Sequence, residues 1–203
     1  MSFFRPGLET RVNTTIAANQ QQPAVAALSN GGYIVTWISA DGGGYYTGVG
    51  LIDRGIYAQL YDADGKAVGS QTRVNTTVAG DQHQPVVAAL SNGSYVVTWL
   101  SNGTLNAQRY DATGNAVGSE TRVTNSIASA AVDALADGGY VVTWIKQNGD
   151  GSAIAAQRYD AAGNSVGRET LVNSTKYLDQ EHPATAGLSE SDSKLILIAR
   201  AVG

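Results

Sequence analysis

One set of short phrases is repeated almost four times along the chain, at intervals of about fifty residues. The marker phrase Glu-Thr-Arg-Val-Asn occupies residues 9–13 and returns in variant form at residues 71–75, 120–124 and 169–173. Between the markers come, in the same order, a short apolar run, a Tyr-x-Val-Thr-Trp phrase and an Ala-Gln-x-Tyr-Asp phrase. Self-similarity at this period is typical of propellers, solenoids and other repeat architectures. The repeat therefore constrains the fold more than any other feature.

Each repeat predicts four short β-strands. The apolar run predicts a first strand, and the Tyr-x-Val-Thr-Trp phrase, rich in β-branched and aromatic residues, predicts a second. The Ala-Gln-x-Tyr-Asp phrase predicts a third strand, and the polar marker phrase predicts the outermost fourth. The first and second strands are joined by hairpin-type sequences such as Ser-Asn-Gly-Gly at residues 29–32, and the third and fourth by Asp-Ala-x-Gly sequences. A four-stranded antiparallel sheet repeated around an axis is a propeller blade.

We expect an all-β fold in one domain, residues 1–203, built as a four-bladed propeller. Its repeat units are residues 9–70, 71–119, 120–168 and 169–203, with residues 1–8 completing the last one. The last unit stops after its second strand, at residues 195–199, so residues 3–5 and 9–13 are expected to supply its outer strands and close the ring. The alternatives are a partial ring completed by a second chain, and a three-fold β-prism or trefoil-like fold.

Composition excludes several classes of function. The net charge is −4 and the 13 Lys and Arg residues are scattered, which argues against a nucleic-acid partner. The chain has no cysteine, so it can form neither disulfides nor thiolate metal sites. No apolar run approaches the ~20 residues of a membrane-spanning helix, so membrane insertion is not expected.

The candidate binding face is the one that carries the irregular connections. In an antiparallel blade, the links from the fourth strand to the next blade and from the second to the third strand lie at one end. Three of the former contain a glutamine-proline phrase, with Gln20, Gln82 and Gln180, and the first unit inserts residues 41–54 with Tyr45 and Tyr46. Loops over a rigid scaffold are where binding residues gather. The alternative is that these glutamines cap the loops.

Aromatic and amide side chains are expected at the rim of the same face. Two explanations fit the tryptophans that end the second strands: packing between blades, or stacking on a sugar ring. Amides and guanidinium groups beside aromatics suit neutral polyhydroxylated ligands. The candidates are Trp37, Trp99 and Trp144, with Gln59, Gln108, Gln157, Arg109 and Arg158 on the third strands.

The sequence predicts no catalytic site and no cofactor. His83 and His182 fall in equivalent loops but out of register, and neither a nucleophile elbow nor metal-ligand spacing is present. An active site needs different residues at different positions, and nearly identical units do not readily supply them. We therefore expect a protein that is not an enzyme. A calcium loop is the weaker alternative at residues 62–65, because the equivalent turns lose the second carboxylate and a plain hairpin turn explains all three.

The repeated phrases resemble tandem repeats of large bacterial secreted and surface proteins, including RTX-type adhesins, over residues 9–198. As a short chain, the protein is similar to small bacterial lectins built from propeller repeats. The calcium-binding nonapeptides of those adhesins are absent. The resemblance implies a homo-oligomeric, non-catalytic carbohydrate-binding protein with repeated shallow sites for glycans. It also implies an extracellular or cell-surface location by leaderless export, with the cytoplasm as the alternative. A structural or adhesive protein-binding module, and thirdly a glycoside-acting enzyme, are the other functions considered.

Overall fold

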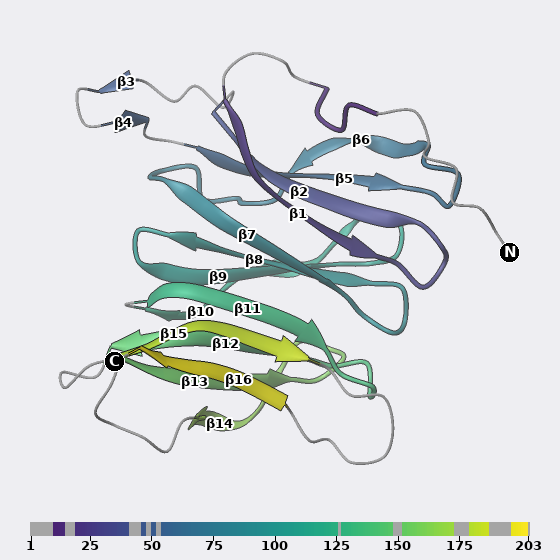
Figure 1. Ribbon diagram of the computed structural model, residues 1–203. Coiled ribbons are helices and arrows are strands. Elements are labelled where there is room, and N and C mark those ends of the chain that lie inside the picture. The colour runs from purple at the N-terminus through teal and green to yellow at the C-terminus, as the bar shows by residue number, and fades with distance from the viewer. Residues whose placement is uncertain are drawn as a thin grey trace, which may run out of the picture.

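A computed structural model describes residues 10–14, 19–40, 46–47, 50–51, 54–125, 127–147, 152–172, 179–186 and 196–202 (Figure 1). The described residues form β-strands joined by turns. The strands are β1 (Gln20–Ala27), β2 (Tyr33–Ser39), β3 (Tyr46–Thr47), β4 (Gly50–Leu51), β5 (Gly55–Tyr61), β6 (Ala67–Arg73), β7 (Gln82–Ala89), β8 (Tyr95–Ser101), β9 (Thr104–Tyr110), β10 (Ala116–Asn125), β11 (Ile127–Ala134), β12 (Tyr140–Gln147), β13 (Ser152–Tyr159), β14 (Ser165–Leu171), β15 (Asp179–Ala186) and β16 (Ile196–Val202).

Three repeats form antiparallel four-stranded sheets, which we call blades. Blade one has the strand order β1-β2-β5-β6, blade two β7-β8-β9-β10 and blade three β11-β12-β13-β14. The fourth repeat is described as the two-stranded sheet β15-β16, and β3-β4 is a small separate pair in the link between β2 and β5. The all-β prediction and the four strands per complete repeat are confirmed. The outermost strands begin earlier than expected, at Ala67, Ala116 and Ser165.

The turn chemistry of the repeat explains why the hairpins form where they do. In blade one, the Leu28 N–H donates to the Gly32 carbonyl, and Gly31 has a φ of 84°, which a side chain would disfavour. A stacked tyrosine pair ties the second and third strands together next to these turns. The pairs are Tyr33–Tyr61, Tyr95–Tyr110 and Tyr140–Tyr159, with ring centroids 4.8, 5.0 and 4.8 Å apart.

The hydrophobic core lies between successive blades. Each blade has a front face and a back face, and the front of one packs on the back of the next. One cluster joins Ile34, Ile38 and Ile56 of blade one to Val97 and Trp99 of blade two. A second cluster repeats this arrangement between blades two and three. The first strands β1, β7, β11 and β15 follow one another along the stack (Figure 1).

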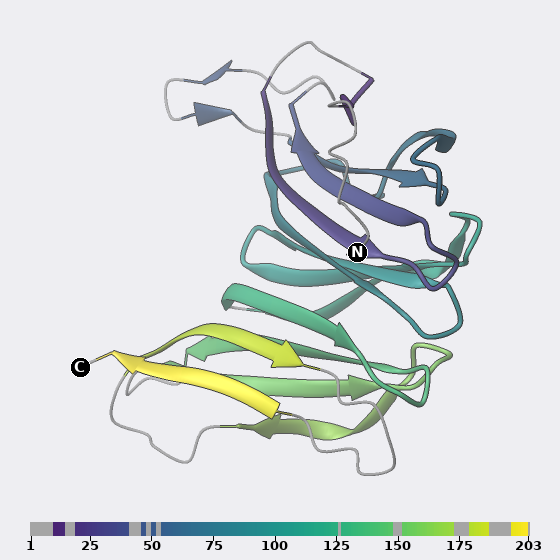
Figure 2. The ribbon, with the colours of Figure 1, turned by 45° about the vertical axis from the view of Figure 1, so that its right-hand side comes forward.

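The stack is open in the part of the chain that the structure describes. Blade one and the β15-β16 pair lie at opposite ends of the molecule in both ribbon views (Figures 1 and 2). The arrangement is propeller-like, but a closed ring is not shown. Of the two segments expected to close it, residues 3–5 lie outside the described residues, and residues 10–13 are described but form no strand. The four-bladed ring therefore stays a prediction. No helix that could cross a membrane occurs among the residues described.

Candidate functional site

The irregular connections meet at one end of the stack, as the strand order requires. The β3-β4 pair lies at the same end as the start of β1 and β7, on the left in Figure 1. The links of neighbouring strands touch there: a side chain added at Gly80 would meet the Asn102 amide at 2.3 Å. We call this the irregular end. The described parts of the variable links lie at this end, while residues 41–45 and 148–151 lie outside the described residues.

A cavity of about 470 Å³ opens at the irregular end of blade two. Polar side chains dominate its walls, and they come from the link before β7, from the hairpin formed by the end of β8 and the start of β9, and from β10. The lining residues are Thr76, Thr77, Ser101, Asn102, Thr104, Asn106, Glu120 and Arg122. Hydroxyl, amide, carboxylate and guanidinium groups thus face one space.

The Glu120 carboxylate is held in a fixed orientation at this cavity. Its Oε2 atom accepts hydrogen bonds from the Thr76 N–H at 2.7 Å, the Thr76 hydroxyl at 2.7 Å and the Thr77 N–H at 3.3 Å. All three donors meet one oxygen atom, and the second, Oε1, accepts none from the described residues. The carboxylate is therefore oriented by one oxygen and has acceptor capacity left on the other.

Two further polar groups of the cavity have hydrogen-bonding capacity to spare. Arg122, two residues after Glu120 on the same strand, makes no hydrogen bond or ion pair with any residue that the structure describes. The Asn106 amide nitrogen donates to the Thr104 hydroxyl at 3.1 Å, which fixes the side chain and leaves its carbonyl oxygen without a described donor. The hydroxyl of Thr104 in turn donates to the Ser101 carbonyl at 2.6 Å. The cavity wall is preorganised by its own hydrogen bonds.

The same position is built differently in blade three. By strand register, Lys146 replaces Ser101, Ala155 replaces Asn106 and Leu171 replaces Arg122, while Glu169 corresponds to Glu120. The Lys146 ammonium group forms an ion pair with Glu169. The carboxylate that is partly free in blade two is therefore engaged by a neighbouring cation in blade three.

The predicted tryptophans lie in the core. Trp37, Trp99 and Trp144 are 4%, 0% and 1% exposed. Packing between blades, one of the two explanations considered, accounts for this burial, and no broad indole face is open for a sugar. The Trp99 N–H donates to the Gln82 Oε1 atom at 2.9 Å. The indole N–H groups of Trp37 and Trp144 have no partner within the described ranges.

The predicted glutamines of the third strands are placed away from the irregular end, contrary to expectation. Gln59 donates to the carbonyls of Leu60 and Val68, where the pairing of β5 and β6 shifts register around Gly69. The same bonds recur for Gln108 and Gln157 in the other blades. A bulge leaves backbone groups unpaired, and these amides satisfy them. Their expected position at the binding rim is therefore wrong.

The two predicted arginines lie at the opposite end, among the short hairpin turns. Arg109 reaches from blade two to the carbonyls of Ala161 and Ala162 in the β13-β14 turn of blade three. Arg158 forms an ion pair with Asp137 of the β11-β12 turn. Both guanidinium groups fasten turns, and neither lines the blade-two cavity. Their expected position beside the irregular loops is also wrong.

The glutamine-proline phrases fasten the links before the first strands. Besides the Trp99 contact, Gln82 donates to the carbonyls of Ala79 and Gly80, each at 3.3 Å, while Gln20 donates to the Ser39 hydroxyl at 2.8 Å. These bonds are those of the capping alternative. The side chain of Gln180 and the whole of Tyr45 lie outside the described residues, and Tyr46 is described only as part of the β3-β4 backbone.

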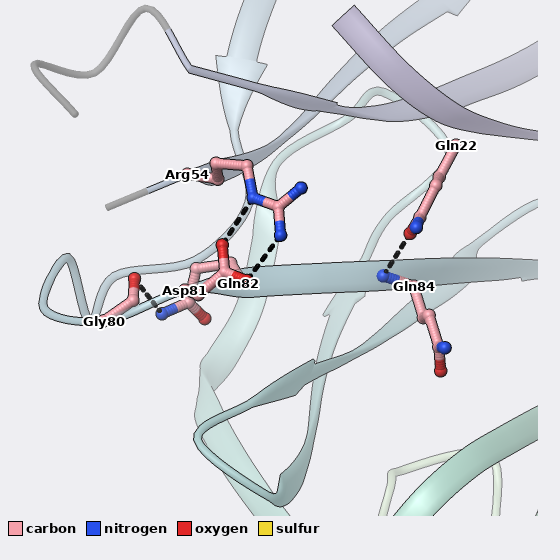
Figure 3. Close-up of polar contacts among 6 residues, drawn as sticks. All are labelled: Gln22, Arg54, Gly80, Asp81, Gln82 and Gln84. Atoms are coloured by element: carbon pink, nitrogen blue, oxygen red, sulfur yellow. Dashed lines mark hydrogen bonds and ion pairs between the residues drawn. The ribbon is translucent and has the colours of Figure 1, made fainter. Parts of the chain in front are cut away.

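Blades one and two are joined at the irregular end by an ion pair and an amide bridge (Figure 3). Both oxygens of the Asp81 carboxylate accept from the Arg54 guanidinium, at 2.5 Å each. The Gln22 Oε1 atom accepts from the Gln84 N–H at 2.8 Å. Burial is the main effect on the pKa of His83 and lowers it. The nearby Asp81 carboxylate raises this pKa and the Arg54 guanidinium lowers it, so the net pKa is below the usual value and the neutral imidazole predominates at pH 7.

The candidate calcium turn is closed by its own backbone. The Asp62 Oδ1 atom accepts from the N–H groups of Asp64 and Lys66, at 3.1 and 2.8 Å. Asp111 and Asp160 accept from the corresponding N–H groups of their own turns. The plain hairpin turn therefore explains the repeated aspartate. Among the described residues, no three His, Cys, Asp or Glu side chains gather as a metal site.

The residues that line the cavity were mostly missed by sequence reasoning. Glu120 and Arg122 belong to the marker phrase, which repeats in every unit and was assigned to a structural outer strand. One signal was available: blade two has the shortest link between its second and third strands, residues 101–104. Next to it, Asn106 stands where the other units have Tyr57 and Ala155.

Comparisons with known proteins place the fold among solved structures. An endo-arabinase from Bacteroides thetaiotaomicron VPI-5482 is similar with a TM-score of 0.51 and 13% sequence identity, over 89% of this chain and 75% of that chain. A protein of unknown function from Dyadobacter fermentans DSM 18053 is similar with a TM-score of 0.47 and 10% identity, over 95% and 75%. No protein-family model and no curated protein matches the chain, so the resemblance to lectins and RTX-type repeats is not confirmed.

The expectation that the protein is not an enzyme is corrected by the first of these structures. The fold is shared with an endo-arabinase, so the architecture is one on which an enzyme is built. Nearly identical units can still differ at a site, because the residues at the cavity of blade two are not all kept in the other blades. The position of Asn106 carries Tyr57 in blade one and Ala155 in blade three. Blade one keeps Ser39 and Arg73 at the positions of Ser101 and Arg122, whereas blade three has Lys146 and Leu171 there.

Proposed function

We propose that the protein binds carbohydrate, and that the cavity of blade two holds one sugar unit of a glycan chain. The observation that carries the proposal is the wall of this cavity of about 470 Å³, in which hydroxyl, amide, carboxylate and guanidinium groups face one space. A sugar offers several hydroxyl groups, each able to donate and accept, and needs several directional partners at once.

Glu120 and Arg122 are complementary in this role. The free Oε1 atom of Glu120 accepts from a sugar hydroxyl, while the Oε2 atom stays on Thr76 and Thr77. The guanidinium of Arg122 donates to sugar oxygens, and the Asn106 carbonyl accepts. Each hydrogen bond to a charged group contributes about 1.5–3 kcal/mol net of the bonds to water that it replaces, so a single site with few such bonds is weak. Repetition of weak sites is the usual route to useful avidity.

The chemistry of the wall favours a neutral ligand. One carboxylate and one guanidinium offset each other, and the chain carries a net charge of −4, so an anionic ligand gains no general attraction. The buried tryptophans do not contribute a stacking platform. Recognition in this proposal therefore depends on hydrogen bonds.

A glycan array followed by titration calorimetry tests the proposal. Arg122→Ala removes the unpartnered guanidinium and should weaken binding of the array ligand by about ten-fold or more, the equivalent of about 1.4 kcal/mol. Leu171→Ala is the matched control, because Leu171 occupies the same strand position in blade three and is also exposed. Absence of binding on an array of neutral plant and bacterial glycans would overturn the proposal, as would equal effects of the two variants.

A glycoside-acting enzyme is the second candidate, and the shared fold of the endo-arabinase favours it. Glycoside hydrolysis generally needs two carboxyl groups flanking the bond. Glu120 is the one carboxylate among the described residues that line the cavity, so the second would have to come from elsewhere. Release of reducing ends from arabinose-containing polysaccharides, abolished by Glu120→Gln, would establish this candidate. Binding without any product would restrict the site to recognition.

A further inference from the structure

The back face of blade one repeats a surface that is buried twice elsewhere in the chain, but its first strand is left exposed among the described residues. Three valines occupy the same position on the first strands of the three blades, each opposite a valine of the second strand. Val87 and Val132 are both 8% exposed, whereas Val25 is 66% exposed. Val87 and Val132 have a preceding blade against them, whereas no blade formed by the described residues lies against Val25.

The rest of this face follows the same pattern. Val97 and Val142 are fully buried, while Val35, their counterpart in blade one, is only half-buried. A mostly apolar cavity of about 180 Å³ lies over Trp37 and is lined by Val12, Pro23 and Val35 among others. We call the surface formed by Val25 and Val35, beside the buried Trp37, the open back face.

The chain itself shows what fits such a face. The back of blade two receives the aliphatic front of blade one, through Ile34, Ile38 and Ile56. The back of blade three receives the front of blade two, through Val96, Leu100 and Leu105. The surface is therefore shaped for the front of another blade from this same repeat. A contiguous apolar surface of this kind is expected to be covered by a partner.

We propose that a second copy of this chain covers the open back face, with its β15-β16 end continuing the succession of blades. In one chain the two ends of the stack lie apart (Figures 1 and 2). Two chains arranged head to tail satisfy both ends at once, through two identical contacts related by a two-fold axis. Each chain contributes four repeat units, so the ring has two times four, or eight, units, within the roughly four to eight blades that propellers use.

This contact does not depend on carbohydrate binding, because the blade-two cavity uses none of the residues of the open back face. Light scattering and sedimentation velocity measure it directly. We expect a mass near 42 kDa, twice the 21.0 kDa of one chain. Val25→Arg places a charge in the contact and should shift the protein to 21.0 kDa. Val68→Arg, on the outer strand β6 where Val68 is 41% exposed, is the matched control and should leave the mass unchanged. Circular dichroism verifies that both variants fold.

A second measurement tests whether the open back face is covered by a second copy of the chain or by another part of the same chain. The protein has no cysteine, so Val25→Cys and Val68→Cys each carry a single thiol. Maleimide labelling of Val25→Cys should be slow in concentrated protein and accelerate on dilution, while Val68→Cys should label at one rate throughout. A protein that is monomeric at all concentrations overturns the inference. Slow labelling of Val25→Cys in that monomer would mean that another part of the same chain covers the face, and fast labelling would mean that the face is exposed to solvent.

Discussion

Blades two and three place a glutamate at the same point of the outer strand and use it in different ways. In blade two, one oxygen of Glu120 is held by Thr76 and Thr77, and the other faces a cavity. In blade three, Glu169 forms an ion pair with Lys146. The backbone that presents the two carboxylates is the same. A repeat fold can therefore keep its core and change the contacts of one position by altering side chains elsewhere in the same blade.

The core beneath these two positions differs less. Trp99 and Trp144 end equivalent strands, and both are buried. Their polar contacts differ, because the position paired with Ser101 is Gln82 and the position paired with Lys146 is Ile127. Trp99 donates to Gln82, and the N–H of Trp144 is without a partner in the described part of the chain. Blade two therefore has both the cavity beside Glu120 and the tryptophan whose indole N–H has a hydrogen-bond partner.

Introducing the lysine of blade three at the equivalent position of blade two should have the largest effect on carbohydrate binding. In Ser101→Lys, the new ammonium group reaches Glu120 as Lys146 reaches Glu169, and its side chain fills part of the cavity. We expect carbohydrate binding to fall by at least about ten-fold, measured by calorimetry. Stability should change by no more than about 1 kcal/mol, because an exposed ion pair contributes little.

The reverse change is the control for this comparison. Lys146→Ser frees Glu169 but supplies neither the amide of Asn106 nor the guanidinium of Arg122, since blade three has Ala155 and Leu171 there. It should leave binding at blade two unaltered. Undiminished binding by Ser101→Lys would mean that the ligand does not occupy this cavity.

Replacing each tryptophan by phenylalanine should produce an intermediate effect that differs between the blades. Trp99→Phe leaves the Gln82 Oε1 atom buried without its donor, which costs about 1–3 kcal/mol in addition to the lost ring volume. Trp144→Phe loses similar volume and breaks no hydrogen bond in the described structure. Urea unfolding should therefore show Trp99→Phe to be the more destabilised variant by about 1–2 kcal/mol. Equal losses would show that the Gln82 contact contributes no net stability.

The repeat made the strands and turns predictable, because each is specified locally. Tyr-x-Val-Thr-Trp favours a strand through β-branched and aromatic residues, and Gly31 permits the turn that follows β1. Closure of the ring was not predictable in the same way. It depends on how each blade is rotated against the next, which is set by packing such as that of Ile38 and Ile56 on Trp99 and not by any local phrase.

The candidate site was harder to predict because repetition conceals differences. Gln59 and its counterparts looked like binding residues since every unit has one, yet each satisfies backbone carbonyls at a bulge. Each blade has this glutamine because each blade has the same bulge, whose backbone carbonyls need a donor. Asn106, which is Tyr57 in blade one and Ala155 in blade three, is the cavity residue that differs in all three blades. In a chain of this kind, departures from the repeat indicate function better than the repeat itself.

The smallest effect is expected at the turns between the third and fourth strands, where blade two has a threonine hydroxyl that blade three lacks. The Asp111 Oδ1 atom accepts from the Thr113 hydroxyl at 2.7 Å, in addition to backbone N–H groups. These bonds, the Thr113 hydroxyl first among them, lower the pKa of Asp111 to about 2. Asp160 has Ala162 at the equivalent position, and hydrogen bonds from Asn164 are the main cause of its lowered pKa.

Thr113→Ala converts the turn of blade two to that of blade three and should raise the pKa of Asp111 toward its ordinary 3.8, measured by NMR titration of the carboxyl group. A lowered pKa in the folded state adds stability above pH 3.8, and this stability is lost as the pH falls toward 2. The variant should thus be less stable at neutral pH, by at most about 0.5 kcal/mol because the turn is exposed, and equal to the parent below about pH 2. Thr113→Ser keeps the hydroxyl and should keep the low pKa. If Thr113→Ala left the titration unchanged, the hydrogen bonds from backbone N–H groups and from the Asn115 amide would account for the lowered pKa, and the turns of the two blades would be electrostatically equivalent.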